Sequence, residues 1–177
     1  SLDPKEPLAH KDLSYVHFMY DWDWEAAAAE YQKAVQYGLK TPDLFMTLFE
    51  IFVYGNTDKG IRLSRQILEN DPLNIEHHWH LGLSYLFADQ LEPALAAFDN
   101  AIELDANYSE GHRWRGVTLT RMGRYNEAIA ALEEALRITE GESPAQLDLM
   151  IAQILNGDTT SVLPVLEAWE TTTQPVE

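Results

Sequence analysis

The amino-acid sequence repeats itself with a period of 34 residues. Gly82 and Gly116 are separated by this interval, as are Ala94 and Ala128. The stretches HHWHLGLSYLFADQLEPALAAFDNAIELDANY and HRWRGVTLTRMGRYNEAIAALEEALRI align along this period, and further starts fall at positions 41 and 143. A repeat of this length is typical of small structural units that cannot bury their own apolar face and must therefore stack on their neighbours.

Caps and turns recur in the same register. Ser143-Pro144 and Thr41-Pro42 both open a repeat, and a hydroxyl cap followed by proline is typical of a helix start. One position is shared by three glycines and one aspartate, and there we expect the chain to reverse between two helices: Gly55, Asp89, Gly123 and Gly157. Each repeat is therefore expected to be a pair of helices, with small residues where the two helices approach.

The motif within each period resembles the tetratricopeptide repeat. It reads His78-x-x-Leu81-Gly82-x-x-Tyr85, followed by Ala94-x-x-x-Phe98 and Ala101. The family's tryptophan slot holds His78, and its closing proline slot holds Pro72, Ala106 and Glu140 in successive repeats. The resemblance implies an all-α fold, a right-handed α-solenoid of about five antiparallel helix pairs. We expect a single domain, 1–177, with repeats at about 8–40, 41–74, 75–108, 109–142 and 143–174.

The first helix of each repeat carries a second stripe, spaced by three and four residues, that we expect to face the concave groove of the solenoid. Its members are Phe45, Phe49, Phe52, Glu76, Trp79, Leu83, Arg113, Val117 and Arg121. We therefore predict a non-enzymatic scaffold that binds a protein partner as an extended peptide or an amphipathic helix. Apolar anchors would lie on the aromatic residues, and an acidic group of the partner would lie near the arginines.

Two narrower comparisons refine this hypothesis. The stretches YDWDWEAAAAEYQKAV and HHWHLGLSY resemble tetratricopeptide arrays attached to bacterial winged-helix regulators and adenylate cyclases, which implies a module of a larger bacterial regulatory protein. The chain begins at Ser1, so we expect it to be part of something longer. Chaperone-binding members of the family use a lysine, asparagine and arginine clamp, whereas here those slots hold Phe45, Phe49, Trp79 and Leu83, so we do not expect a chaperone co-factor.

A histidine cluster offers an alternative function. His77 and His80 lie three residues apart on one predicted helix, a spacing that metal ligands use, so a metal-binding or enzymatic role stays open. Packing is the preferred interpretation, because His78 and His112 occupy the same slot of successive repeats. Neither a nucleophile elbow nor a glycine-rich phosphate loop is present in the sequence, so we expect no catalytic residues and no cofactor.

Charge and composition restrict the partners. The formal charge of −17 opposes contact with phosphate backbones, so we expect no direct nucleic-acid binding. The most apolar stretch, 44–54, is too short to span a bilayer, so we expect no membrane insertion. Cysteine is absent and no signal peptide is visible; a cytoplasmic location is favoured and a periplasmic one stays open.

The C-terminal end suggests a further partner. Leu163, Leu166 and Trp169 recur every three residues, and no later repeat follows in the sequence to cover them. Terminal repeats normally present a polar outer face. We therefore keep self-assembly, as a weak homodimer through this end, as an alternative function.

Overall fold

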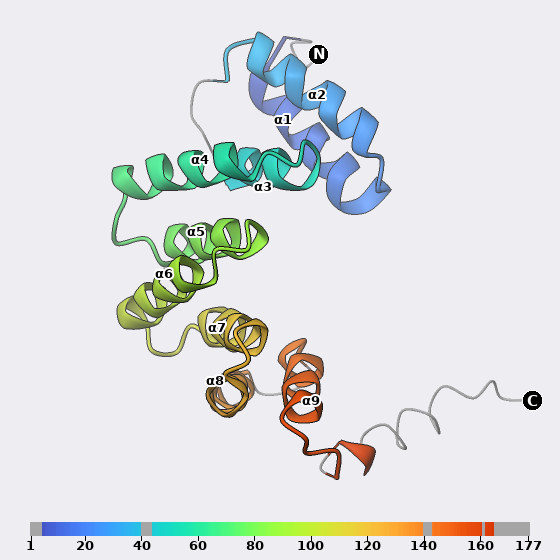
Figure 1. Cartoon of the computed structure of the whole chain (residues 1–177). Coiled ribbons are helices and arrows are strands. Elements are labelled where there is room, and N and C mark those ends of the chain that lie inside the picture. Colours follow the sequence, from blue (N-terminus) through green and yellow to red (C-terminus); the bar gives the residue numbers. More distant parts are fainter. Residues whose placement is uncertain (1–4, 40–43, 140–142, 161, 165–177) are drawn as a thin grey trace, which may run out of the picture. The chain divides into compact units, whose positions relative to one another are not determined.

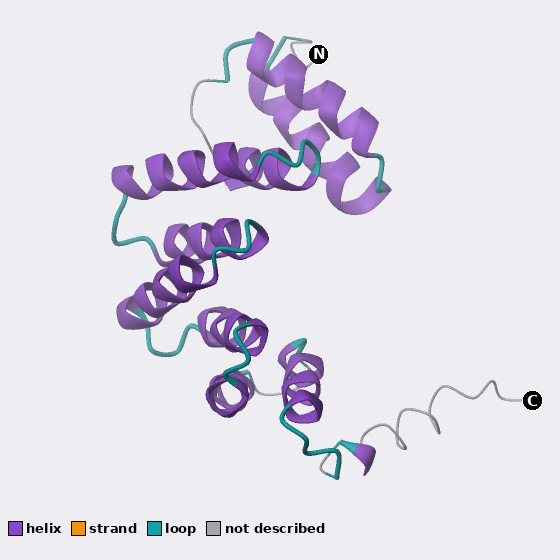
Figure 2. Cartoon of the chain, viewed as in Figure 1, coloured by secondary structure: helices purple, strands orange, loops and turns teal. Residues whose placement is uncertain are grey.

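The computed structural model describes residues 5–39, 44–139, 143–160 and 162–164, and within 44–46 it describes the backbone alone. Throughout these ranges the regular structure is helical, and Figure 2 shows the helices joined by short loops without any strand. The fold class is therefore all-α, as predicted. The chain divides into two compact units, residues 1–72 and 73–177, and each is described by itself.

Unit 1 holds the first two helix pairs. Its elements are α1 (Pro7–Val16), a π-helical turn η1 (His17–Asp21), α2 (Trp24–Gln36), α3 (Leu44–Phe52) and α4 (Thr57–Asn70). Asp23 caps the start of α2, because its carboxylate accepts a hydrogen bond from the backbone N–H of Ala26 at 2.9 Å. The core of this unit is built from Phe18, Ala27, Tyr31 and Phe49.

Unit 2 holds the helices that follow the 34-residue period most closely. They are α5 (Ile75–Phe87), α6 (Leu91–Leu104), α7 (Ser109–Arg121), α8 (Tyr125–Ile138) and α9 (Ala145–Leu155), as Figure 1 shows. The predicted starts at 75 and 109 are the first residues of α5 and α7, and the Ser143 hydroxyl accepts a hydrogen bond from the Ala145 N–H at 3.3 Å at the start of α9. Of the predicted C-terminal stripe, Leu163 lies within the described residues, whereas Leu166 and Trp169 lie outside them.

Close contact between paired helices explains the small residues of the repeat. A Cβ atom added at Gly82 would lie 2.5 Å from the Phe98 ring, and one at Gly116 would lie 2.5 Å from the Leu132 side chain. Phe98 and Leu132 are both fully buried, so neither can swing aside. Glycine is thus required at these two positions by the approach of α5 to α6 and of α7 to α8.

The shared turn position adopts the left-handed conformation in all four repeats where it was predicted. The φ angles are +65° at Gly55, +59° at Asp89, +75° at Gly123 and +87° at Gly157. Glycine enters this region freely, and aspartate tolerates it better than most residues. In the pairs α3–α4, α5–α6 and α7–α8, the chain therefore reverses through a left-handed residue at the same position of the repeat.

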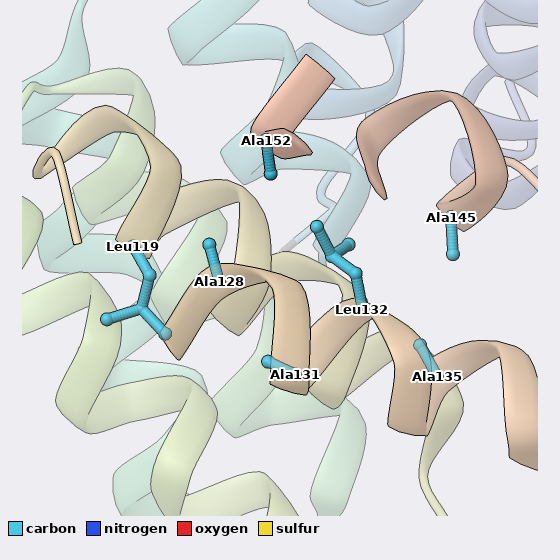
Figure 3. Close-up of a cluster of buried hydrophobic side chains, with 7 residues drawn as sticks. All are labelled: Leu119, Ala128, Ala131, Leu132, Ala135, Ala145 and Ala152. Atoms are coloured by element: carbon cyan, nitrogen blue, oxygen red, sulfur yellow. The ribbon is translucent and has the colours of Figure 1, made fainter. Parts of the chain in front are cut away.

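Alanines on α8 bring α7 and α9 close together in unit 2. Figure 3 shows the side chains of this core, and all of them are almost fully buried: Leu119, Ala128, Ala131, Leu132, Ala135, Ala145 and Ala152. Five of these seven residues are alanine, so the helix backbones approach closely. This packing positions the exposed face of α7 beside that of α9.

Candidate functional site

The predicted groove residues of unit 1 separate into different environments. Phe49 is fully buried, stacks on Tyr31 with 5.0 Å between ring centroids, and contacts Phe18 at 5.9 Å. Its assignment to a binding surface is therefore wrong, because the ring fills the core of unit 1. Phe52, at the end of α3, is 45% exposed. The side chain of Phe45 lies outside the described residues.

The three predicted residues on α5 also differ from one another. Glu76 is exposed in the first turn, whereas Leu83 is only 5% exposed and belongs to the core, so its assignment to the groove surface is wrong. Trp79 is partly buried, and its ring meets the His80 ring edge-on at 4.5 Å. Within the part of the chain that the structure describes, the Trp79 indole N–H has no hydrogen-bond partner.

The predicted residues of α7 share a face with residues of α9. The Arg113 guanidinium donates a 2.7 Å hydrogen bond from Nε to the Asp148 carboxylate, and a longer one to Glu110. Its guanidinium also lies over the Trp114 ring, 4.8 Å from the centroid. Arg113 is therefore fixed in place by groups of its own chain.

Arg121 is held in a similar way at the other end of α7. Its guanidinium donates to the Leu86 carbonyl at 2.8 Å and to the Asp89 carboxylate at 2.7 Å. Asp89 is the one residue other than glycine at the repeated turn position. Arg121 thus ties α7 to the turn that follows α5.

A shallow pocket opens between α7 and α9, with a volume of about 160 Å³. It is lined by Val117, Thr120, Arg121, Asp148 and Ile151. We call this pocket, together with Glu110 and Arg113, the α7–α9 face. Asp148 and Ile151 were missed by the sequence reasoning, although each lies about one period after a residue on α7 that was singled out.

An acidic corner lies at the N-terminal ends of α5 and α7. Burial raises the pKa of Tyr108, and the negative charges of Glu76 and Glu110 add to this shift, so that the pKa is about 12. The carboxylates of Glu76 and Glu110 therefore both lie near the Tyr108 hydroxyl. Glu110 also accepts a 3.0 Å hydrogen bond from the indole N–H of Trp114, which fixes its position.

The histidines are used for packing and surface contacts. Burial lowers the pKa of His80, and the charge of the neighbouring His77 adds to this shift, so that the pKa is about 4. The His112 ring bonds to the Ala106 carbonyl oxygen at 2.9 Å. Among the described residues, no group of three histidine, aspartate or glutamate side chains is arranged to hold a metal ion.

Every arginine of unit 2 forms an ion pair with a carboxylate of the same unit. The pairs are Arg113 with Asp148 and Glu110, Arg115 with Asp99, Arg121 with Asp89, Arg124 with Glu127, and Arg137 with Glu134. Unit 2 contains no lysine, so these five arginines are all of its permanent cations. We expected Arg113 and Arg121 to bind an acidic group of a partner. Both are instead paired with carboxylates of their own unit, which argues against that role.

Paired helices that recur with a constant period, with a left-handed residue at the turn inside each pair, define a class of helical-repeat proteins. Residues 80–143 match the tetratricopeptide repeat family. The similarity to this family thus covers residues 80–143, and the all-α fold is shared with solved tetratricopeptide-repeat proteins. Among the curated proteins, no sequence match was found. In the described parts, no helix combines the length and apolar character needed to cross a bilayer.

Solved structures with the same fold include a thermophilic tetratricopeptide-repeat protein of Thermus thermophilus. It is 17% identical, with 86% of this chain and 84% of that chain covered and a TM-score of 0.72. The MamA protein is 18% identical, with 97% of each chain covered and a TM-score of 0.62. The second such domain of human RPAP3, solved with the HSP70 peptide SGPTIEEVD, is 24% identical over 63% of this chain and 98% of its own, with a TM-score of 0.54.

Proposed function

We propose that this protein is a non-enzymatic interaction scaffold that binds a peptide or helix of a protein partner on the α7–α9 face. The observation that carries the proposal is the open pocket between α7 and α9, which offers apolar surface from Val117 and Ile151 beside fixed polar groups. Binding sites for peptides combine an apolar anchor pocket with a few oriented polar groups in this way.

The relatives in fold support this role. The RPAP3 domain was solved with an HSP70 peptide, and the first domain of Spaghetti was solved with the HSP90 peptide SRMEEVD. We extend peptide binding from these proteins to this chain as a proposal. We further propose, from the aromatic and acidic stretches at 20–35 and 77–85, that the chain is a module of a larger bacterial regulatory protein.

Panning of a random peptide library on the full chain tests the proposal. Selected peptides should lose about tenfold or more in affinity for the Ile151→Glu variant, because a charge then occupies the apolar pocket. Leu104→Glu on α6 is the matched control, since Leu104 is 39% exposed and Ile151 is 43% exposed. Peptides that bind the parent and the Ile151→Glu chain equally well, or a library that yields no binder, would contradict the proposal.

A second copy of the chain is the other candidate partner. Leu147, Ile154 and Leu155 on α9 all present exposed apolar side chains. Apolar surface gathered on one helix is typical of an interface. We therefore retain weak homodimerisation through the C-terminal end as the second proposed function, and its test is given in the Discussion.

A further inference from the structure

We infer that the peptide recognised by the α7–α9 face is positively charged, with an apolar anchor about three residues from a lysine or arginine. The inference rests on the proposed function, because it names the chemistry of the ligand for the same face. Three observations carry it: the charge of unit 2, the internal pairing of its arginines, and the spacing between the pocket and the acidic corner.

The charge of unit 2 is strongly negative. Residues 73–177 contain 17 aspartates and glutamates but five arginines and no lysine. The same imbalance is present around the candidate site, where Glu76, Asp89, Glu110 and Asp148 accompany two arginines. A negative surface accelerates the approach of a cationic ligand and slows that of an anionic one, and salt screens both effects.

The two arginines of the face are already neutralised. Arg113 and Asp148 form their pair at 2.7 Å with both side chains 19% exposed, and Arg121 is held by a carbonyl and a carboxylate. A carboxylate from a ligand would have to displace Asp148 or Asp89 and leave that group without its cation. Such an exchange replaces one ion pair by another and gains little. An acidic ligand therefore finds no unpaired cation on this face.

Carboxylates remain available to a cationic ligand. Glu76 is exposed and forms no ion pair within the described ranges, and the ion pair of Glu110 with Arg113 is long, at 3.4 Å. Both lie near Tyr108 at the ends of α5 and α7 where the helices begin. A guanidinium or ammonium group placed there would gain attraction without breaking a short internal pair.

The distance between the apolar pocket and Glu110 determines how far apart the apolar and the basic side chain lie in the peptide. Glu110 and Val117 are seven residues apart on α7, two helical turns, so they project from the same side of the helix about 10 Å apart. A peptide in the polyproline II conformation advances about 3.1 Å per residue with three residues per turn, so side chains three residues apart lie on the same side of the peptide and about 9 Å apart. An apolar side chain in the pocket thus places the residue three positions away over Glu110.

Binding of short capped peptides to the full chain tests the inference. The first peptide carries leucine and arginine three positions apart in an alanine and serine background; its twins replace arginine by glutamate, or move it next to leucine. The acidic peptide SGPTIEEVD serves as a further probe. At low ionic strength the first peptide should bind about tenfold more tightly than the glutamate twin, and the difference should shrink as salt is added.

Matched variants distinguish a direct contact of the peptide with Glu110 from the overall negative charge of unit 2. Glu110→Gln should weaken binding of the arginine peptide several-fold and leave binding of the glutamate twin unchanged or improved; glutamine keeps an oxygen for the Trp114 N–H. Glu103→Gln on α6, exposed beside a separate pocket, removes the same charge and should have little effect. Circular dichroism checks that both variants fold.

The outcomes distinguish the two proposals. Equal or tighter binding of the glutamate twin or of SGPTIEEVD, lost on Ile151→Glu, would overturn the charge preference and leave the peptide-binding function standing. Equal effects of Glu103→Gln and Glu110→Gln would overturn the local contact. Absence of binding by every peptide would overturn both.

Discussion

The Arg113 guanidinium lies 2.7 Å from the Asp148 carboxylate and so joins α7 to α9 across one repeat. Both side chains are mostly buried, so we expect a double-mutant cycle with Arg113→Gln and Asp148→Asn to give a coupling free energy of about 1 kcal/mol. The free energy of unfolding in urea is the measurement. The exposed pair Arg137–Glu134, within α8, is the control and should show no measurable coupling. Equal coupling in the two pairs would contradict the structural role of the first.

Close helix packing predicts that larger side chains at the contact positions destabilise unit 2. Gly82→Leu and Ala94→Leu should each lower the free energy of unfolding by about 1–3 kcal/mol or more, because a side chain at Gly82 meets the buried Phe98 ring and Ala94 is itself fully buried. Ala96→Leu, at an exposed position on the same helix as Ala94, is the control. Thermal unfolding measures all three. Unchanged stability in the first two would refute the packing of α5 on α6.

These contacts could be predicted from the sequence, because Gly82 and Gly116 differ by one period and a glycine repeated inside a helix indicates close approach of a second helix. The turn residues were equally predictable, since a left-handed position recurs with glycine in three repeats out of four. The burial of Phe49 was not predictable. Leu44–Phe52 is apolar on almost every side, so helical spacing alone does not separate a core side chain from a groove side chain.

The ion pairs of the candidate face were also missed, and the reason is sequence distance. Asp148 follows Arg113 by 35 residues, and Asp89 precedes Arg121 by 32. Neither spacing belongs to a single helix, where pairs lie three or four residues apart. A search for opposite charges near one full period would have found both pairs.

The left-handed conformation of Gly123 predicts that the loss of stability depends on which residue replaces it. Gly123→Ala should cost about 1 kcal/mol of stability, because the φ of +75° is strained for a residue with a Cβ atom. Gly123→Asn should cost less, since asparagine tolerates this region. Urea unfolding of the two variants is the measurement. Nothing surrounds a Cβ atom at this position within 4 Å, so the effect comes from the backbone alone. An alanine variant as stable as the parent would refute it.

Burial of neutral His80 predicts a loss of stability in acid. Its folded pKa is lowered to about 4 from 6.5, so between these values the unfolded chain binds a proton that the folded chain does not. The contribution of neutral His80 to the free energy of unfolding is fully present above pH 6.5. It decreases as the pH falls towards 4, by at most about 3 kcal/mol. Urea unfolding across this range is the measurement.

The control compares two histidine variants. His80→Phe should flatten this part of the pH profile, because the titrating group is gone. His112→Gln, which alters a ring bonded to a surface carbonyl, should leave the profile unchanged. If His80→Phe kept the full acid dependence, another group would be responsible for it.

The C-terminal stripe expected from the sequence, of which the structure describes the exposed Leu163, predicts weak self-association. Sedimentation of the parent chain should show a dimer that grows with moderate salt, because screening reduces repulsion between copies that each carry −17. Trp169→Glu should reduce it. A parent chain that stays monomeric at high protein concentration, at both low and moderate salt, would contradict this prediction.

The distribution of basic residues has a practical consequence for attaching the protein to a surface or a label. All five lysines of the sequence belong to residues 1–72, and residues 73–177 contain none. Reagents that acylate amines will therefore modify unit 1 and leave unit 2 chemically untouched. A chain coupled through its amines to a sensor chip will carry its anchorage entirely on unit 1, and its α7–α9 face will be free of covalent modification.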